Sequence, residues 1–406
     1  MARLKVPAPL AALARDTRTP FYYFDESKLR DLARHWRRAA KIGLKIFYPY
    51  KCNRFPGILD SLAREGFGAE INLAADLNEA RIRGIEGDRL LMHGPVKEPD
   101  AIDRVLAAGG IFAVDSIADG NAVLERSFAI GRRPRYLLRI RAADAREGQR
   151  AFGMTPTDIA RFTRVAARGG RPLPAGLAFH LGTGISTVAP YRTSIRVAAK
   201  LARVQKNSGA PVSILDVGGG FPSAGETRFD DRGRPHRTSW TDPAVIARDL
   251  AGEARRRLGD VEVWIEPGRA LVADAFHLVT RVVRVRAGRD VFVDGSRMAH
   301  GFFIARGSHP VVLIPSRRGK VLPVVLAGPL GTDLDVFVRR LAAVPPREGD
   351  VLVFGNVGAY NLIAANAWAG AIPPVKTSGD AKALKERRES EWSSRSSPEP
   401  RSSPRA

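Results

Sequence analysis

The chain has 406 residues, a net charge of +23 and 44% hydrophobic residues, which is enough apolar content for one barrel with a smaller second domain. Its single cysteine, Cys52, excludes a disulfide framework within the chain. No run of about 18 apolar residues is present, so the sequence predicts a cytoplasmic protein without a membrane partner.

The positive charge is compatible with nucleic-acid binding, but the cations do not cluster with aromatic residues, and no recognition motif accompanies them. Arginine usage spread over helix surfaces is the simpler interpretation. Part of the charge would also suit an anionic cofactor or an acidic substrate. We therefore expect no nucleic-acid partner.

The first predicted elements are a short strand at residues 21–25 and a helix at residues 27–40. Beyond them, short apolar runs alternate with amphipathic stretches of helical period. Eight runs predict strands, at residues 45–50, 68–72, 89–93, 111–115, 136–140, 176–180, 213–217 and 261–266. This rhythm is typical of an α/β fold, and it predicts parallel strands that close into a (β/α)8 TIM barrel over residues 26–275.

The rhythm changes after residue 275, where β-rich segments follow one another without long helices between them. They predict a C-terminal antiparallel β domain over residues 276–375. Residues 1–25, which include the first strand, are expected to join this domain. Residues 376–406 are rich in Ser, Arg, Pro and Glu and almost free of apolar residues, so they predict a disordered basic tail.

Polar residues and glycines gather where the predicted barrel strands end. Active sites of such barrels lie at the carboxyl ends of the strands, so these positions are candidates for a site. A structural role would explain any one of them, but it is a strained explanation for all eight. The groups are Lys51, Glu70, His93, Asp115, Arg139–Arg141, His180–Thr183, Asp216–Gly220 and Glu266–Arg269.

Lys51 has the amine that can hold an aldehyde cofactor as a Schiff base, and desolvation in a pocket is expected to lower its pKa. Taken alone, a lysine after a strand is more often a solvated strand end. Gly218, Gly219 and Gly220 would let backbone N–H groups approach a phosphate, although such a run is also compatible with a bare turn.

Glu266 can keep a pyridine nitrogen protonated, which makes the ring an electron sink. Gly268 and Arg269 would add backbone and charge to a phosphate-binding cup. His180 can stack against the ring, or it is an ordinary buried histidine. These groups together indicate pyridoxal 5′-phosphate (PLP), and we expect no metal.

Six segments between about residues 20 and 370 resemble, in order and spacing, the motifs of the fold-type III PLP decarboxylases, which include diaminopimelate and ornithine decarboxylases. No single motif is decisive, but their order together is specific. Thr183 stands where the family has serine. The segments are Tyr50-Lys51-Cys52-Asn53, Ala69-Glu70, Phe179-His180-Leu181-Gly182-Thr183, Asp216-Val217-Gly218-Gly219-Gly220-Phe221-Pro222, Glu266-Pro267-Gly268-Arg269 and Gly358-Ala359-Tyr360.

The resemblance implies a PLP-binding barrel with a β domain, and a homodimer whose active sites are shared between subunits. It implies a small amino-acid substrate and catalytic roles for Lys51, His180 and Glu266. Further cofactor contacts are implied for Glu70, Thr183, Gly218, Gly219, Gly220, Gly268, Arg269 and Tyr360.

One segment departs from the family pattern. The family has Gly-Pro-x-Cys followed by an acidic residue, and that cysteine returns a proton to the substrate carbon. Here Gly331 and Thr332 occupy these two positions. Glycine has no proton to donate, so Lys51, a tyrosine or water would have to replace the cysteine, or catalysis would fall roughly 10²–10⁴-fold.

The same departure leaves substrate recognition open. Asp335 matches an aspartate that the family retains, and Asp333 is a candidate for the acidic role. Arg297 and His300 are further candidate substrate contacts, or surface polar residues.

Three functions remain compatible with these observations. A decarboxylase of an atypical amino acid is favoured, because the cofactor motifs are retained while the substrate loop is not. A racemase or a decarboxylation-coupled transaminase of the same fold is the second, although the glycine run and the Glu-Pro-Gly-Arg segment disfavour a plain alanine racemase. The third is a non-catalytic regulatory relative, which the retained Lys51 opposes.

Overall fold

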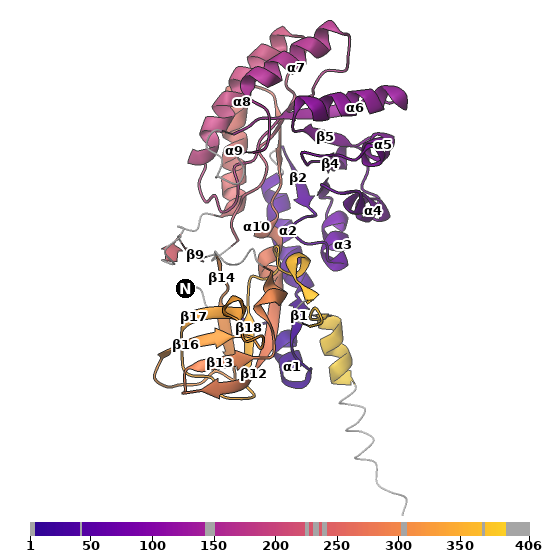
Figure 1. Ribbon diagram of the computed structural model, residues 1–406. Helices are drawn as coiled ribbons and strands as arrows, with labels where there is room; N and C mark the ends of the chain where they lie inside the picture. Colours follow the sequence, from indigo (N-terminus) through magenta and orange to yellow (C-terminus); the bar gives the residue numbers. More distant parts are fainter. Residues whose placement is uncertain are drawn as a thin grey trace, which may run out of the picture.

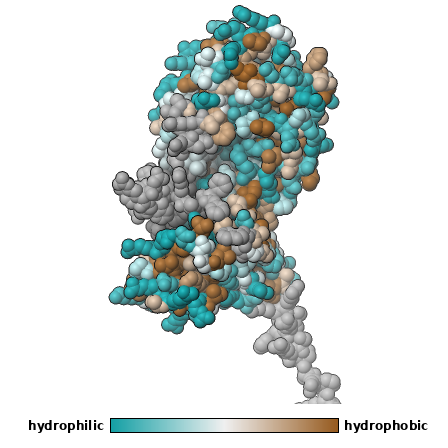
Figure 2. Space-filling view, in the orientation of Figure 1, coloured by the Kyte–Doolittle hydropathy of each residue, from teal (hydrophilic) through white to brown (hydrophobic). Residues whose placement is uncertain are grey.

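The computed structural model describes residues 5–40, 43–142, 151–223, 227–229, 235–237, 242–301, 307–367 and 370–386. These residues form a helix-rich barrel and, beside it, a β domain (Figure 1). Hydrophilic residues dominate the visible face of the outer helices of the barrel (Figure 2). No helix in the described ranges is both long and apolar enough to cross a membrane.

Eight parallel strands close into the barrel, which confirms the predicted (β/α)8 architecture. Closure comes from the pairing of the last strand with the first, with Val263 opposite Leu44 and Ile265 opposite Ile46. The observed strands lie within one or two residues of the predicted runs. They are β2 (Leu44–Pro49), β3 (Gly68–Ile71), β4 (Leu90–Met92), β5 (Ile111–Val114), β6 (Arg135–Arg139), β7 (Gly176–Ala178), β8 (Ile214–Asp216) and β11 (Glu262–Ile265).

The strands read as continuous apolar runs because they are buried on both faces. Some of their side chains fill the barrel interior as a separate cluster that includes Phe47, Leu137 and Trp264. The rings of Phe47 and Trp264 lie 4.8 Å apart between centroids. The interior is therefore packed, and polar chemistry is confined to the ends of the strands.

Helices that follow the strands form the outer layer (Figure 1). Proline in the first turn and side-chain caps mark where several of them begin. Thr155, for example, accepts a hydrogen bond from the Asp158 amide. The helices are α2 (Glu26–Ala40), α3 (Pro56–Arg64), α4 (Ala74–Ile82), α5 (Pro99–Ala107), α6 (Ile117–Ala129), α7 (Pro156–Arg168), α8 (Ala189–Asn207), α9 (Pro243–Leu258) and α10 (Arg269–Val272).

The β domain is built on one eight-stranded sheet, which is mixed. Most neighbours are antiparallel, as the sequence predicts, but β13 pairs parallel with β16 and β1 pairs parallel with β19. A parallel pairing needs no hairpin, so it can join segments that are distant in the chain. The strands are β1 (Phe21–Phe24), β12 (Phe276–Arg286), β13 (Asp290–Val293), β15 (Val311–Ile314), β16 (Leu322–Ala327), β17 (Val336–Ala343), β18 (Val351–Phe354) and β19 (Val375–Thr377).

Strand β1 pairs antiparallel with β12, so the start of the chain lies in the sheet of the β domain. Helix α1 (Ala8–Asp16) packs its buried Leu10 and Leu13 against the same sheet. A separate three-stranded sheet combines β9 (Thr227–Phe229) and β10 (Pro235–Arg237) with β14 (Gly307–Ser308).

The end of the described chain differs from the prediction of disorder from residue 376 onward. Strand β19 extends to Thr377, and residues 378–386 are helical. Ala381 and Leu384 of this helix pack against the apolar cluster beneath α1. Composition missed this segment because it is stabilised by a remote pairing with β1 rather than by its own apolar content. Residues 387–406 of the predicted tail lie outside the described residues.

A buried carboxylate holds the loops of the β domain together. Asp335 is 1% exposed, and one of its oxygens accepts hydrogen bonds from Ser296 Oγ at 2.8 Å and from the Arg297 amide at 2.6 Å. Its other oxygen accepts from the Leu330 amide at 3.0 Å. A Cβ at Gly328 would lie 2.3 Å from that second oxygen, so this position requires glycine.

We expect Gly328→Ala to lower the free energy of unfolding by about 3–4 kcal/mol, because the Asp335 carboxylate would lose its hydrogen bonds in a buried site. Gly331→Ala is the matched control in the same loop. A Cβ at Gly331 meets nothing within 4 Å, but its φ of +66° disfavours alanine, so the expected loss is about 1 kcal/mol. Urea denaturation measures both, and equal losses would contradict this account of Asp335.

His277, on β12, predicts acid sensitivity of the fold. Burial lowers its pKa to about 4, so the folded protein keeps the imidazole neutral. As the pH falls below the unfolded value of about 6.5, only the unfolded chain takes up the proton, and stability is lost. Between about pH 7 and pH 5, His277→Phe should lose about 2 kcal/mol less stability than the natural chain in urea denaturation. Equal losses for both proteins would rule out this role.

Candidate active site at the mouth of the barrel

Lys51 follows β2 and forms an ion pair with Glu70 of the neighbouring strand β3. Its Nζ donates to both carboxylate oxygens of Glu70, at 2.8 and 2.7 Å, and Asn72 donates to one of them at 2.6 Å. Glu70 is fully buried, whereas the Lys51 side chain is 45% exposed toward the mouth of the barrel. The amine is therefore held in one orientation and is still within reach of a ligand.

The charge of this lysine differs from the expectation. Burial favours the neutral amine, but Glu70 and Glu266 outweigh it, and the pKa of Lys51 is raised rather than lowered. The expected lowering considered desolvation alone. The structure adds two carboxylates that the sequence does not place beside the amine.

The glycine run after β8 forms a tight turn against its neighbours. The Gly218 amide donates to Asp216 Oδ1 at 2.8 Å, and Gly218 and Gly220 have φ values of +68° and +95°. A Cβ at Gly219 would lie 2.3 Å from the Glu266 carbonyl oxygen, and a Cβ at Gly220 would lie 2.3 Å from that of Gly182. Only glycine satisfies this turn, which brings backbone close to the site.

His180 lies beside this turn, at the end of the neighbouring strand. Its Nδ1 accepts a hydrogen bond from the Gly219 amide at 3.2 Å, which leaves the proton of the neutral ring on Nε2. Burial lowers the pKa of His180 to about 3, and Lys51 and Arg139 add to this effect against Glu266. A neutral ring suits stacking better than charge pairing. Thr183, in the following loop, is exposed.

Glu266 is part of a buried cluster with His93 and Asp216. His93 Nε2 lies 2.9 Å from Glu266 Oε1 and 3.6 Å from Asp216 Oδ2. Burial opposes the charge of His93, but the two carboxylates outweigh it and raise its pKa to about 9. Burial likewise opposes the charge of Glu266, but His93 holds the pKa of this carboxyl well below its usual range.

Asp216 carries less of the negative charge, because burial and the nearby Glu266 raise its pKa to about 7. The donor atoms of the three residues lie within 4.8 Å of one another, a spacing at which a metal ion could also bind. The proton on His93 already supplies a positive charge there. Glu266 Oε2 makes no hydrogen bond to the described residues, so it is available to a ligand.

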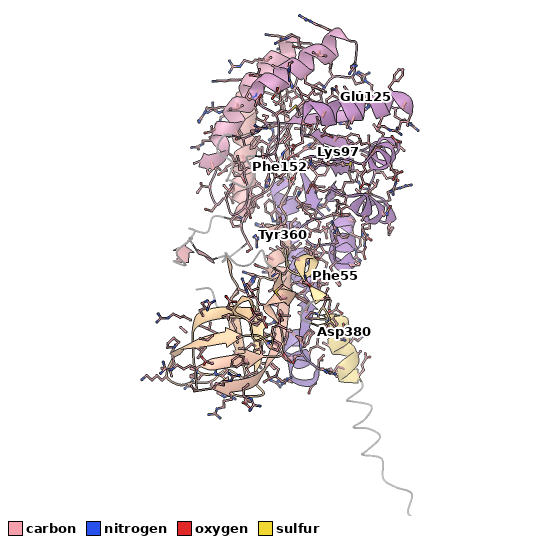
Figure 3. The ribbon with its side chains drawn as sticks, in the orientation of Figure 1. Phe55, Lys97, Glu125, Phe152, Tyr360 and Asp380 are labelled. Atoms are coloured by element: carbon pink, nitrogen blue, oxygen red, sulfur yellow. The ribbon has the colours of Figure 1, made fainter. Side chains whose placement is uncertain are left out.

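Tyr360 connects the β domain to the barrel mouth (Figure 3). Its amide donates to the Cys52 carbonyl oxygen at 2.8 Å, directly after the cofactor-lysine candidate, and its ring lies 5.3 Å from the Arg269 guanidinium. A φ of +65° places this tyrosine in the left-handed region, a strained conformation that is frequent at functional sites. Burial raises the pKa of the Cys52 thiol to about 12 although Arg269 opposes this, so the thiol stays protonated.

Two further ion pairs lie behind the mouth. Arg139 Nη1 contacts Asp115 Oδ1 at 3.0 Å, and its guanidinium lies 5.1 Å from the Phe152 ring. Lys97 Nζ donates to Asp119 at 2.6 Å and to two backbone carbonyl groups (Figure 3). These charges are already paired within the chain, so the structure gives them a supporting role.

The candidate substrate residues do not meet Lys51 within this chain. Arg297 Nη1 donates to the Leu334 carbonyl oxygen at 3.1 Å, and the carboxylate of Asp335 is occupied by the loop contacts described above. Asp333 is exposed and Thr332 is partly exposed on the same loop. Asp335 is therefore placed as a structural residue rather than a substrate contact. The side chain of His300 lies outside the described residues.

The roles of His93 and Asp216 were missed at the level of sequence. Both were recognised as rim residues, but no spacing pairs His93 with Glu266, because the two residues come from opposite ends of the barrel sequence. The only available signal was their shared position at the carboxyl ends of strands.

Comparisons with known proteins agree with this architecture. The diaminopimelate decarboxylase of Zymomonas mobilis is 24% identical over 405 residues, which cover 94% of this chain and 93% of that protein. The chloroplastic ornithine decarboxylase of Nicotiana glauca is 25% identical over 378 residues, covering 88% and 82%. A solved diaminopimelate decarboxylase from M. jannaschii in complex with L-lysine has a TM-score of 0.78 at 21% identity, covering 90% of this chain and 89% of that one.

The family model for the pyridoxal binding domain of pyridoxal-dependent decarboxylases matches residues 26–273, which is more than half of the chain and the whole of the barrel. The matched region contains Lys51, Glu70, His180, the glycine turn and Glu266. The chain therefore belongs to the pyridoxal-dependent decarboxylase family, whose cofactor is pyridoxal phosphate.

Proposed function

We propose that this protein is a PLP-dependent decarboxylase of an amino acid with an atypical side chain. The observation that carries the proposal is the Lys51 amine, held by Glu70 at the barrel mouth yet accessible from it. A lysine that served only to neutralise Glu70 would not need to be exposed at the mouth of the barrel. The same mouth gathers the glycine turn, a neutral histidine and an ionised glutamate.

These groups fit the cofactor. The turn at Gly218–Gly220 has no room for a Cβ, so its backbone can approach a phosphate closely. The Gly218 and Gly219 amides bind Asp216 and His180, which leaves the Gly220 amide as the one of the three to donate to a phosphate oxygen. Arg269 supplies a positive charge beside Tyr360 at the same end of the barrel. Glu266, with one oxygen available, is the acid suited to a protonated pyridine nitrogen.

When bound, the cofactor supplies an electron sink for the electron pair that the departing carboxylate leaves behind. Lys51 would hold the cofactor through its amine. Glu70 keeps this amine, when it is free, charged and oriented. His180 presents a neutral ring that can cover one face of the site.

The proton donor follows from the charges around Lys51. Gly331 has no side chain, and the Cys52 thiol is buried beneath Tyr360 and Arg269. The raised pKa keeps Lys51 protonated, and its side chain is exposed to the mouth, so it is the group placed to return a proton to the substrate carbon. We therefore assign that step to Lys51.

We assign the contacts to the substrate side chain to a second copy of this chain. Asp333 is exposed and Thr332 is partly exposed on a loop whose described side-chain hydrogen bonds all stay within the β domain. A homodimer is the arrangement in which this loop would reach a barrel mouth. A hydroxyl at Thr332 is a poor partner for a distal ammonium group. We therefore expect a substrate without the distal amine of ornithine. We also propose that the enzyme works in the cytoplasm.

The test is a screen of purified holoenzyme against a broad amino-acid panel, with CO₂ and products measured by mass spectrometry. We expect CO₂ release from at least one amino acid, and a loss of roughly 10²–10⁴-fold in Lys51→Ala, which removes both the anchor and the acid. Thr332→Ala is the matched control, because it should alter the KM of that substrate and leave cofactor binding unchanged.

Inversion of a substrate without CO₂ release would replace the proposal with a racemase, and amine transfer would replace it with a transaminase. A holoenzyme that converts none of the panel would favour a regulatory protein.

A further inference from the structure

His93 lies beside Glu266, the carboxylate that the proposed function assigns to the ring nitrogen of the cofactor. It follows β4, across the barrel from β11, and its Nε2 lies at ion-pair distance from Glu266 Oε1, at 2.9 Å. Both residues are buried, at 7% and 5% exposure. The contact therefore lies out of solvent, where a charge pair is least screened.

The same nitrogen lies 3.6 Å from Asp216 Oδ2, and the other oxygen of Asp216 accepts from the Gly218 amide at 2.8 Å. One imidazole thus connects two places that the proposed function assigns to opposite ends of the cofactor. One is the glutamate for the ring nitrogen, and the other is the glycine turn for the phosphate.

We infer that His93 is a positioning residue, which holds Glu266 through Oε1 so that Oε2 is presented to the ring nitrogen of the cofactor. The inference rests on the assignment of Glu266 in the proposed function. It adds a residue that touches neither cofactor nor substrate, and it explains why a third charged side chain is buried at this rim.

Electrostatics supports this role. Two buried carboxylates, Glu266 and Asp216, lie close together, and without a cation between them one would take up a proton. Among the other described cations at this end of the barrel, Lys51 forms its ion pair with Glu70 and Arg139 forms its ion pair with Asp115. Arg269 lies against the Tyr360 ring. His93, with its pKa raised to about 9, is the cation that lets Glu266 stay ionised at neutral pH.

The groups around His93 come from several strands. Glu266 and Asp216 face it directly, from the ends of β11 and β8. Glu70 on β3 adds a weaker attraction that also favours the charged imidazole. His180 responds to the charge on His93, which is a further reason why it stays neutral.

The test compares two ligands in His93→Leu, which removes the charge, and in His93→Gln, which keeps a donor without the charge. The ligands are PLP and its 1-deaza analogue, in which a C–H group replaces the ring nitrogen. Dissociation constants are measured by quenching of tryptophan fluorescence without substrate, so the result does not depend on turnover. Circular dichroism verifies that each variant is folded, and His93→Asn replaces His93→Leu if the latter is not.

We expect His93→Leu to weaken PLP binding by roughly 10–100-fold, the loss of a charged interaction, and to leave the Kd of the deaza analogue unchanged. His93→Gln should fall between the natural chain and His93→Leu. In the Glu266→Gln background, His93→Leu should cause no further loss of PLP affinity, because the group that it positions is already neutral.

Equal weakening of both ligands by His93→Leu would overturn the inference and leave His93 with a structural role. A metal ion retained stoichiometrically by the natural chain and lost in His93→Leu would also overturn it, because the cluster would then be a metal site. A natural chain that binds PLP normally but releases no CO₂ from any amino acid would refute the proposed function and leave this inference standing.

Discussion

The site depends on the compensation of buried negative charge at one end of the barrel. Glu70, Asp216 and Glu266 are almost completely removed from solvent, and each needs a partner to stay ionised or a proton to become neutral. Lys51 forms an ion pair with Glu70. His93 forms one with Glu266 and, at a longer distance, one with Asp216. Lys51 and Glu70 come from neighbouring strands, whereas His93 and Glu266 follow β4 and β11, so the second pair depends on closure of the barrel.

The β domain adds the second constraint. Tyr360 carries the chain back to the barrel and binds, through its amide, the carbonyl group of Cys52, next to the lysine that we assign to the cofactor. Its left-handed backbone and its contact with Arg269 are maintained by the packing around them. Asp335 connects two segments of the β domain through its hydrogen bonds with Ser296 and Leu330. These bonds occupy its carboxylate, so it is not available to substrate.

Much of the fold was predictable, because it is encoded locally. The run at residues 111–115 is short, begins with four apolar residues and ends in a charge, and it became β5. The end of the described chain was not predictable, since Val375–Thr377 is ordered by pairing with β1, which lies at the other end of the sequence. Composition predicts how much apolar surface a segment can bury by itself, but it does not predict pairing with the edge of a distant strand.

Sequence alone determined the barrel, the cofactor motifs and the position of each candidate group at a strand end, because strand period and motif order are local properties. Only the tertiary structure decided how those groups behave. It raised the pKa of Lys51, which desolvation alone would have lowered, and it made His93 the partner of Glu266. Both outcomes are set by distances of a few ångströms between residues far apart in the chain, and such distances exist only once the barrel has closed.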